Sequence, residues 1–249
     1  MDTVRTVHAS ATAEHRAARA ELAAAERQLR AAAERVAALR RSLPPGPEVD
    51  PATPLTTASG KPVTLGGLFG PHRTLLTYGM RFDEGWDEPC PTCAMWVDGL
   101  DGVAPHLAER AGVAVLAPAS PGQLAAVAAR RAWTWVPVAS TQPGDLLDRL
   151  GARDEDGRPT AVLSVFHWGE DGRVRLHWQG PAGEVGSASR EAGATGEADG
   201  EPAGEPAGEP DGEIDLVRSL CAAWGLLDLL PEGPGDWRPT RRDRPAPRR

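Results

Sequence analysis

Two cysteines separated by two residues, Cys90 and Cys93, are the part of this sequence best suited to chemistry. A candidate buried strand at 73–78 and a loop precede them, and Pro91 predicts that a helix begins at the dithiol. Cys90 then occupies the N-cap position, where free backbone N–H groups and the helix dipole favour its thiolate form. We therefore expect Cys90 to attack a disulfide or an oxidised sulfur, and Cys93 to resolve the mixed intermediate.

The loop before the dithiol holds side chains that would modulate it. Four of them are acidic and would raise the pKa of the thiol if they lie close in space: Asp83, Glu84, Asp87 and Glu88. The side chain of Trp86 would shield the thiol, grip a substrate or, as the commoner role, pack against the core. Together with Pro91 and Thr92, which stand between the cysteines, Trp86 is a candidate substrate contact.

A structural role is the main alternative for the two cysteines. Structural zinc sites usually take four ligands, often from two closely spaced pairs, and this sequence has no second pair. The six histidines show no ligand spacing: His8, His15, His72, His106, His167 and His177. The third cysteine, Cys221, falls on the apolar face of a predicted C-terminal helix and is expected to be a core residue. We therefore expect no metal and no bound cofactor.

The charge and hydropathy of the 249-residue chain restrict its partners and its location. A formal net charge of −8 disfavours binding to nucleic acid, which requires a basic surface. No stretch approaches the roughly 18 apolar residues of a membrane helix, and the first residues lack the apolar core of a signal peptide. We therefore expect no membrane partner and a cytoplasmic location, where thiols are normally kept reduced.

A long amphipathic helix is predicted over residues 11–41, within an N-terminal segment of 1–45. Its apolar side chains alternate spacings of three and four, which is a heptad pattern: Leu22, Ala25, Leu29, Ala32, Val36, Leu39 and Leu43. Such a seam either packs on the chain's own domain or pairs two chains into a homodimer. The sequence favours neither interpretation.

The pattern after a linker at 46–60 is that of an α/β domain at 61–230 with a mixed central sheet. Predicted strands lie at 62–65, 73–78, 113–117, 135–139, 161–168 and 173–178, the last two forming a hairpin. Predicted helices lie at the dithiol, 120–131, 144–150 and 214–227. Gly99, Gly102 and Pro105 predict that the helix after the dithiol is bent or broken.

Two segments lack the composition of a folded domain. Residues 182–212 form an acidic insert of near-repeated Glu-Pro-Ala-Gly units, which cannot bury enough apolar surface to offset the chain entropy. Residues 231–249 form a basic tail that is interrupted by prolines. We predict that both segments are disordered.

Short motifs around the dithiol add a resemblance to known proteins. They are LLTY at 75–78, GW at 85–86, CPTC at 90–93 and WVDG at 96–99. Over roughly residues 22–178, this string resembles an uncharacterised bacterial thioredoxin-like family allied to the alkyl hydroperoxide reductase and thiol-specific antioxidant proteins (AhpC/TSA). The resemblance implies a thioredoxin-like fold and, by analogy, a reaction at the dithiol.

The sequence departs from these relatives at two places. Many thioredoxin-like proteins carry a cis-proline just before the hairpin, facing the dithiol, and counting back from the turn places Leu163 or Ser164 there. Pro159 lies several residues too early, so the substrate-docking corner is expected to be altered. The proline and threonine that precede a peroxidatic cysteine are also absent, which disfavours direct peroxide reduction.

These observations predict a thiol–disulfide oxidoreductase or thiol-dependent antioxidant protein. Its partners would be a disulfide or oxidised-thiol substrate and a cellular thiol reductant. The alternative is a non-catalytic thioredoxin-fold scaffold or adaptor that pairs through its N-terminal helix, and a third possibility is an AhpC-like peroxidase. A reactive, exposed Cys90 with a low pKa favours the enzyme, whereas a shielded pair with an ordinary pKa favours the scaffold.

Overall fold

The computed structural model describes residues 11–182 and 222–237. In chain order the elements are α1 (Ala13–Arg41), β1 (Pro54–Thr57), β2 (Pro62–Thr64), the 3-10 helix η1 (Gly66–Phe69), β3 (Thr74–Gly79), α2 (Pro91–Leu107), β4 (Gly112–Ala117), α3 (Pro121–Arg131), β5 (Val138–Ser140), α4 (Leu146–Arg149), β6 (Val162–Trp168), β7 (Val174–Pro181) and α6 (Ala222–Leu227). The strands in these residues form one sheet in the order β2-β1-β5-β4-β3-β6-β7.

The sheet contains the strand arrangement of a thioredoxin fold. β3 and β4 pair in parallel and are joined through α2, which begins at the dithiol. β6 pairs antiparallel with the other side of β3, and β7 completes a hairpin with β6. β5 extends the sheet in parallel from β4, and β1 and β2 form the far edge. The predicted α/β thioredoxin-like fold is therefore confirmed.

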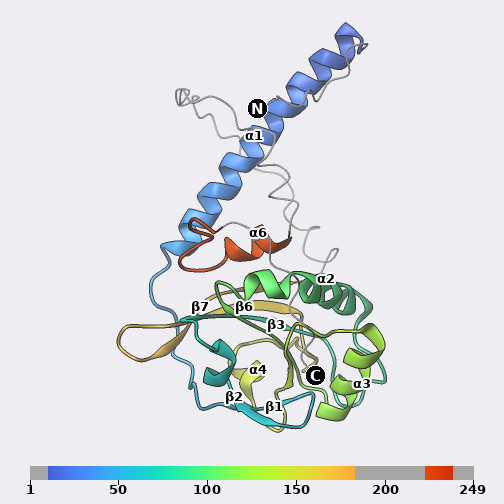
Figure 1. Cartoon of the computed structure of the whole chain (residues 1–249), viewed down its shortest axis with the longest axis vertical. Helices are drawn as coiled ribbons and strands as arrows, with labels where there is room; N and C mark the ends of the chain where they lie inside the picture. Colours follow the sequence, from blue (N-terminus) through green and yellow to red (C-terminus); the bar gives the residue numbers. More distant parts are fainter. Residues whose placement is uncertain (1–10, 183–221, 238–249) are drawn as a thin grey trace.

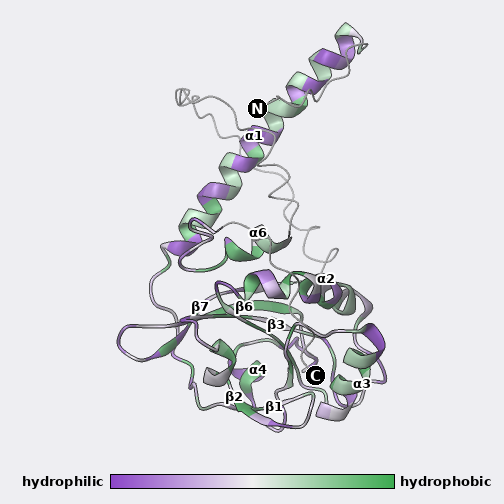
Figure 2. Cartoon of the chain, in the orientation of Figure 1, coloured by the Kyte–Doolittle hydropathy of each residue, from purple (hydrophilic) through white to green (hydrophobic). Residues whose placement is uncertain are grey.

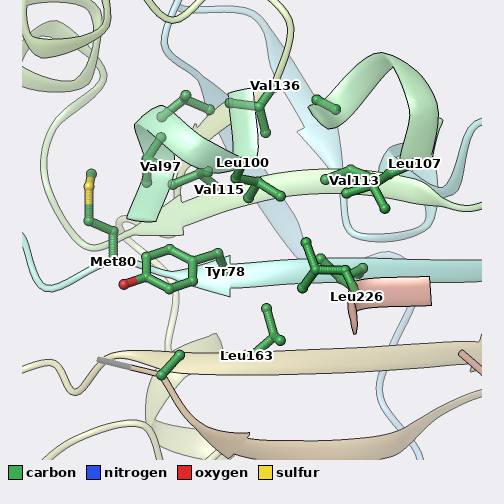
Figure 3. Close-up of a cluster of buried hydrophobic side chains, with 14 of the residues drawn as sticks. Tyr78, Met80, Val97, Leu100, Leu107, Val113, Val115, Val136, Leu163 and Leu226 are labelled. Atoms are coloured by element: carbon green, nitrogen blue, oxygen red, sulfur yellow. The ribbon is translucent and has the colours of Figure 1, made fainter. Parts of the chain in front are cut away.

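Each face of the sheet is covered by its own apolar layer, because neighbouring residues of a strand point to opposite faces. Leu76 and Tyr78 of β3 belong to the layer beneath α2, α3 and α6. Figure 3 shows part of that layer, with Val97 and Leu100 of α2 near the strand that carries Tyr78. Leu75 lies in the opposite layer, which includes residues of η1 and α4. Fully burying one such side chain contributes roughly 2 kcal/mol, so the core fixes β3 and α2, the two elements that position the cysteines.

The predicted N-terminal helix is present as α1, which projects away from the sheet (Figure 1). Thr12 is the N-cap residue before it, and the Thr12 side-chain oxygen accepts a hydrogen bond from the His15 N–H at 3.1 Å. Its C-terminal end is anchored to the domain, since Ala37 is buried and the Arg40 guanidinium lies 4.9 Å from the ring centre of Trp178.

The predicted linker at 46–60 is partly wrong, because it contains a strand of the sheet. β1 pairs with both β2 and β5, and Leu55 is 2 % exposed within the core. Glu48 also forms an isolated β-bridge with Arg175. The prolines that suggested a linker lie at the edges of these paired stretches, where a missing N–H is tolerated.

The predicted disordered tail at 231–249 is wrong for its first seven residues. Trp237 is 8 % exposed, and its indole N–H donates to Glu109 Oε2 at 2.8 Å. Its ring also meets His106 edge-on, at 6.3 Å between ring centres. The described part of the domain therefore extends through residue 237, because the burial of one large aromatic side chain orders the segment that carries it.

Two local predictions need correction. The helix after the dithiol was predicted to be bent or broken, and the break is wrong: α2 runs continuously from Pro91 to Leu107, with Pro105 in its last turn. The strand predicted at 135–139 is β5, which begins only after Pro137.

The position predicted to replace the cis-proline is also different. Leu163 and Ser164 lie inside β6, opposite Tyr78 and Thr77 of β3, rather than before the hairpin. A cis peptide bond instead joins Gln142 to Pro143, after β5. The remaining predictions for the insert at 182–212, for Cys221 and for residues 238–249 lie outside the described residues, except that Ala182 is described and buried.

Candidate active site

Cys90 stands at the junction between the loop after β3 and the first turn of α2. It occupies the N-cap position, with Pro91 as the first helical residue, as the sequence predicted. Its own N–H donates to the Arg81 carbonyl at 3.0 Å, and its carbonyl accepts from the Ala94 N–H at 3.0 Å. These two backbone bonds fix the thiol at the open end of the helix, where its side chain is partly exposed.

The surroundings of Cys90 lower the pKa of its thiol. Partial burial acts in the opposite direction and raises the pKa, but it is outweighed by hydrogen bonds that stabilise the thiolate. These come from the backbone N–H groups of Cys93 and Thr92 and from the side chain of Cys93, and the positive charge of Arg81 adds to them. Cys90 is therefore predisposed to ionise and act as a nucleophile.

Cys93 lies one turn further along α2, and its surroundings raise the pKa of its thiol. It is 1 % exposed, and this burial raises its pKa. The backbone N–H of Arg81 donates to its sulfur at 3.4 Å, and the Tyr78 hydroxyl beside it also favours the thiolate, but neither offsets burial. The two sulfurs thus differ in exposure and in the direction of their pKa shifts, which is the difference that thiol–disulfide exchange requires between an attacking and a resolving thiol.

Tyr78 of β3 lies beside the two cysteines. Its side chain is buried, and its hydroxyl has no partner with good hydrogen-bond geometry among the described residues. Burial, together with the neighbouring thiols, raises its pKa far above its usual value, so the phenol stays protonated. Its ring stacks on Trp96 of α2, with ring centres 6.0 Å apart.

The carboxylates of the acidic loop are not among the groups that set the pKa of Cys90, and three of the four have a side-chain partner of their own. Glu88 pairs with Arg130 at 2.7 Å, and Asp83 pairs with Arg153 at 3.5 Å. Glu84 accepts a hydrogen bond from Gln142 Nε2 at 3.3 Å. The pKa of Cys90 is instead governed by burial, by hydrogen bonds from α2 and by Arg81.

The three candidate substrate contacts take different positions. Pro91 is exposed and Thr92 half-buried, so both lie at the surface beside Cys90. Trp86 is half-buried and, like Cys90, packs against the core layer beneath α2. Its carbonyl accepts from Gln123 Nε2 at 3.0 Å. Of the interpretations given for Trp86, packing describes the geometry of the side chain.

The other sequence candidates do not join the dithiol. His106 lies in the last turn of α2, against Trp237, far along the helix from Cys90. Within residues 11–182 and 222–237, no group of three or more His, Cys, Asp and Glu side chains is arranged to hold a metal. No helix of these residues is long and apolar enough to cross a membrane.

Residues 4–190 match a family described as bacterial protein of unknown function, DUF899. The chain belongs to the DUF899 family. No curated protein matches it.

Several solved structures are similar to this DUF899 protein over about half of its length. Peroxidoxin BcpB from Mycobacterium tuberculosis is 18% identical, with 52% of this chain and 81% of that chain covered and a TM-score of 0.41. A PrxQ mutant from Xylella fastidiosa is 15% identical, with coverages of 55% and 87% and a TM-score of 0.40. A peroxiredoxin-like protein from Aquifex aeolicus is 14% identical, with coverages of 57% and 78% and a TM-score of 0.43. Identities this low assign no activity to the DUF899 chain.

The sequence interpretation missed two functional residues of the DUF899 site. Arg81 uses three groups at once: its carbonyl, its N–H and its charge all act on the two cysteines. Gln123 of α3 anchors the loop, since its Nε2 donates to the Glu84 and Trp86 carbonyls while its Oε1 completes the capping box with Ser120. The Ser120-Pro121 pair predicted the N-cap of α3, but no pattern in the sequence predicted that α3 lies beside the loop before the dithiol.

Replacing Arg81 by methionine is expected to raise the pKa of Cys90 in the DUF899 protein. The substitution keeps both backbone contacts and removes the positive charge that favours the thiolate. Labelling of Cys90 by iodoacetamide, followed by mass spectrometry against pH, should show a higher midpoint and a rate at neutral pH that is lower by roughly twofold to tenfold. Arg81→Lys, which keeps the charge, should recover most of the rate. An unchanged midpoint in Arg81→Met would contradict an electrostatic role for this side chain.

Proposed function

We propose that this protein is a thiol–disulfide oxidoreductase in which Cys90 is the nucleophile and Cys93 the resolving thiol. The observation that carries the proposal is the asymmetry of the pair: Cys90 is partly exposed with a lowered pKa, and Cys93 is buried with a raised pKa. A scaffold has no need for this difference, because an inert pair is normally shielded at both sulfurs. A reducing compartment such as the cytoplasm would keep the pair in its dithiol form.

The reaction follows from the positions of the two sulfurs. The Cys90 thiolate attacks one sulfur of a substrate disulfide, forming a mixed disulfide and releasing the other substrate sulfur as a thiolate. Cys93 then loses its proton and attacks the Cys90 sulfur, which forms the Cys90–Cys93 disulfide and releases the second substrate thiol. The substrate disulfide gains two electrons and two protons, and the protein dithiol loses them. A cellular dithiol or low-molecular-weight thiol returns the protein to its reduced form.

Two features of the chain support the second step. The Arg81 N–H, 3.4 Å from the Cys93 sulfur, and the protonated Tyr78 hydroxyl both stabilise negative charge as it develops on Cys93. Cys93 is also buried, so a substrate disulfide in solution reacts first with Cys90, and Cys93 reacts only after the mixed disulfide has formed. Pro91 and Thr92 form the surface that a substrate meets beside Cys90.

A redox titration of the full-length protein tests the proposal. The protein would be equilibrated with a series of reduced and oxidised dithiothreitol, and its thiols would be counted by alkylation and mass spectrometry. We expect a reversible two-electron couple that disappears in Cys90→Ser and in Cys93→Ser and persists in Cys221→Ser. A pair that never oxidises, or that copurifies with stoichiometric zinc, would overturn the proposal in favour of a non-catalytic or metal-binding role.

A further inference from the structure

The exposed apolar side chains of the described residues are concentrated on one stripe of α1. Outside this stripe, the large exposed hydrophobic residues are Met95 and Trp96. The stripe holds Leu22, Leu29, Val36 and Leu39 of the helix, with Leu43 just beyond its end, and these side chains are between 42% and 67% exposed. Figure 2 shows apolar and polar bands along the projecting helix. Such a stripe, about 25 Å long from Leu22 to Leu39, is large enough to pair two helices.

A different face of α1 contacts the domain. Ala37 is buried there, and the half-buried Arg40 lies over the ring of Trp178. In a heptad numbering that places Leu22, Leu29 and Val36 at position a, the apolar stripe is the seam formed by positions a and d. Ala37 falls at position b and Arg40 at position e, about 100° around the helix from that seam. The seam is therefore not the face with which α1 packs on its own domain.

We propose that two copies of this protein associate through α1 as an antiparallel helix pair. The sizes of the seam residues favour this orientation: the a positions carry Leu22, Leu29 and Val36, and the d positions before them carry Ala18, Ala25 and Ala32. In a parallel pair, a faces a and d faces d, so wide leucine layers would alternate with alanine layers that leave gaps. In an antiparallel pair, Leu22, Leu29 and Val36 each face an alanine, and the helices keep one separation along this part of the seam.

The charges beside the seam point to the same orientation and also to the register. A parallel pair would set Glu21 against Glu26 and Arg35 against Arg40 of the second copy, each twice, and like charges at these positions are repulsive. The attractive contact of that arrangement is Glu14 against Arg19, so repulsive contacts outnumber attractive ones two to one. An antiparallel pair with Leu29 opposite Ala25 of the second copy sets Glu21 against Arg35, twice. The like-charged contact that remains on these flanks is Glu26 against its own copy.

Charge reversal on the full-length protein separates the two orientations. Glu21→Arg and Arg35→Glu each break the two antiparallel ion pairs, so each should raise the dimer Kd in sedimentation equilibrium at low salt by roughly fivefold to tenfold. The double variant restores the pairs in reversed order and should return the Kd close to that of the unaltered protein. In a parallel dimer, each single change would turn a repulsion into an attraction and lower the Kd. Tighter association of the single variants would therefore overturn the antiparallel arrangement.

Removal of the seam tests the interface itself. Leu29→Asp together with Val36→Asp should raise the Kd by on the order of 100-fold or more, since each dimer would bury four carboxylates. Ala31→Asp with Ala38→Asp is the matched control, because both residues are exposed and lie off the seam. Circular dichroism would check that each variant keeps its helix content. A protein that sediments as a monomer at all concentrations, or a dimer that survives the seam variant, would overturn the proposal.

Discussion

Cys90→Ser is expected to abolish reduction of a small neutral disulfide such as hydroxyethyl disulfide, lowering kcat/KM by about 1,000-fold or more. Serine keeps the size and the N-cap position of the residue but does not ionise at neutral pH. The variant therefore has no nucleophile at the partly exposed position at the start of α2 where the surroundings lower the pKa of Cys90. Consumption of the disulfide in the presence of excess dithiothreitol, corrected for the uncatalysed rate, measures the effect.

Cys93→Ser is expected to give a different defect at the same site. Attack by Cys90 still occurs, but the mixed disulfide is no longer resolved within the protein. When the reduced protein is mixed with the disulfide in the absence of dithiothreitol, which would cleave the adduct, the mixed disulfide should accumulate and be visible by mass spectrometry. Cys221→Ser is the control for loss of a thiol and should react like the unaltered protein. A Cys90→Ser protein that keeps its rate, or a Cys93→Ser protein that turns over normally without an adduct, would contradict the assigned roles.

Asp101→Ala is expected to have the largest effect on stability. Asp101 is 7 % exposed, and its Oδ1 accepts three backbone hydrogen bonds, from the N–H groups of Thr134 at 3.0 Å, Trp135 at 2.7 Å and Val136 at 2.9 Å. One carboxylate of α2 thus holds the whole segment that leads into β5. Alanine would leave these donors without their acceptor, and we expect a loss of about 3 kcal/mol in the free energy of unfolding.

Urea unfolding followed by circular dichroism measures this loss. Asp101→Asn keeps an oxygen acceptor without the charge and should lose about half as much. Asp98→Ala, one turn earlier on α2, removes an exposed partner of Arg131 that also accepts from the Trp133 indole N–H, and should cost about 1 kcal/mol or less. Equal losses for Asp98→Ala and Asp101→Ala would show that the triple acceptor has no special role.

Hydrophobic periodicity and cap residues in the sequence were sufficient to predict most of the elements and an α/β sheet of mixed direction, while the resemblance around the dithiol implied the thioredoxin-like fold. The strands β3, β4, β6 and β7, the helices α1 and α3, and the start of α2 at Cys90 lie close to their predicted positions. Hydrophobic periodicity, N-cap residues and turn glycines act over a few neighbouring residues, so they are readable along the chain. The β1 strand and the burial of Trp237 were missed, because both depend on partners far away in the sequence.

The candidate site divides in the same way. The sequence alone identified Cys90 and Cys93, the helix N-terminus between them and the heptad seam of α1, since all three are local patterns of residue type and spacing. The tertiary structure decided whether the helix N-terminus or the acidic loop has the larger effect on the pKa of Cys90, because pKa values depend on distances through space. It paired Glu88 with Arg130 and Asp83 with Arg153, and it brought the charge of Arg81 to bear on the thiol. It also buried Cys93 beside Tyr78, which gives the two sulfurs of one local motif different exposures and pKa values shifted in opposite directions.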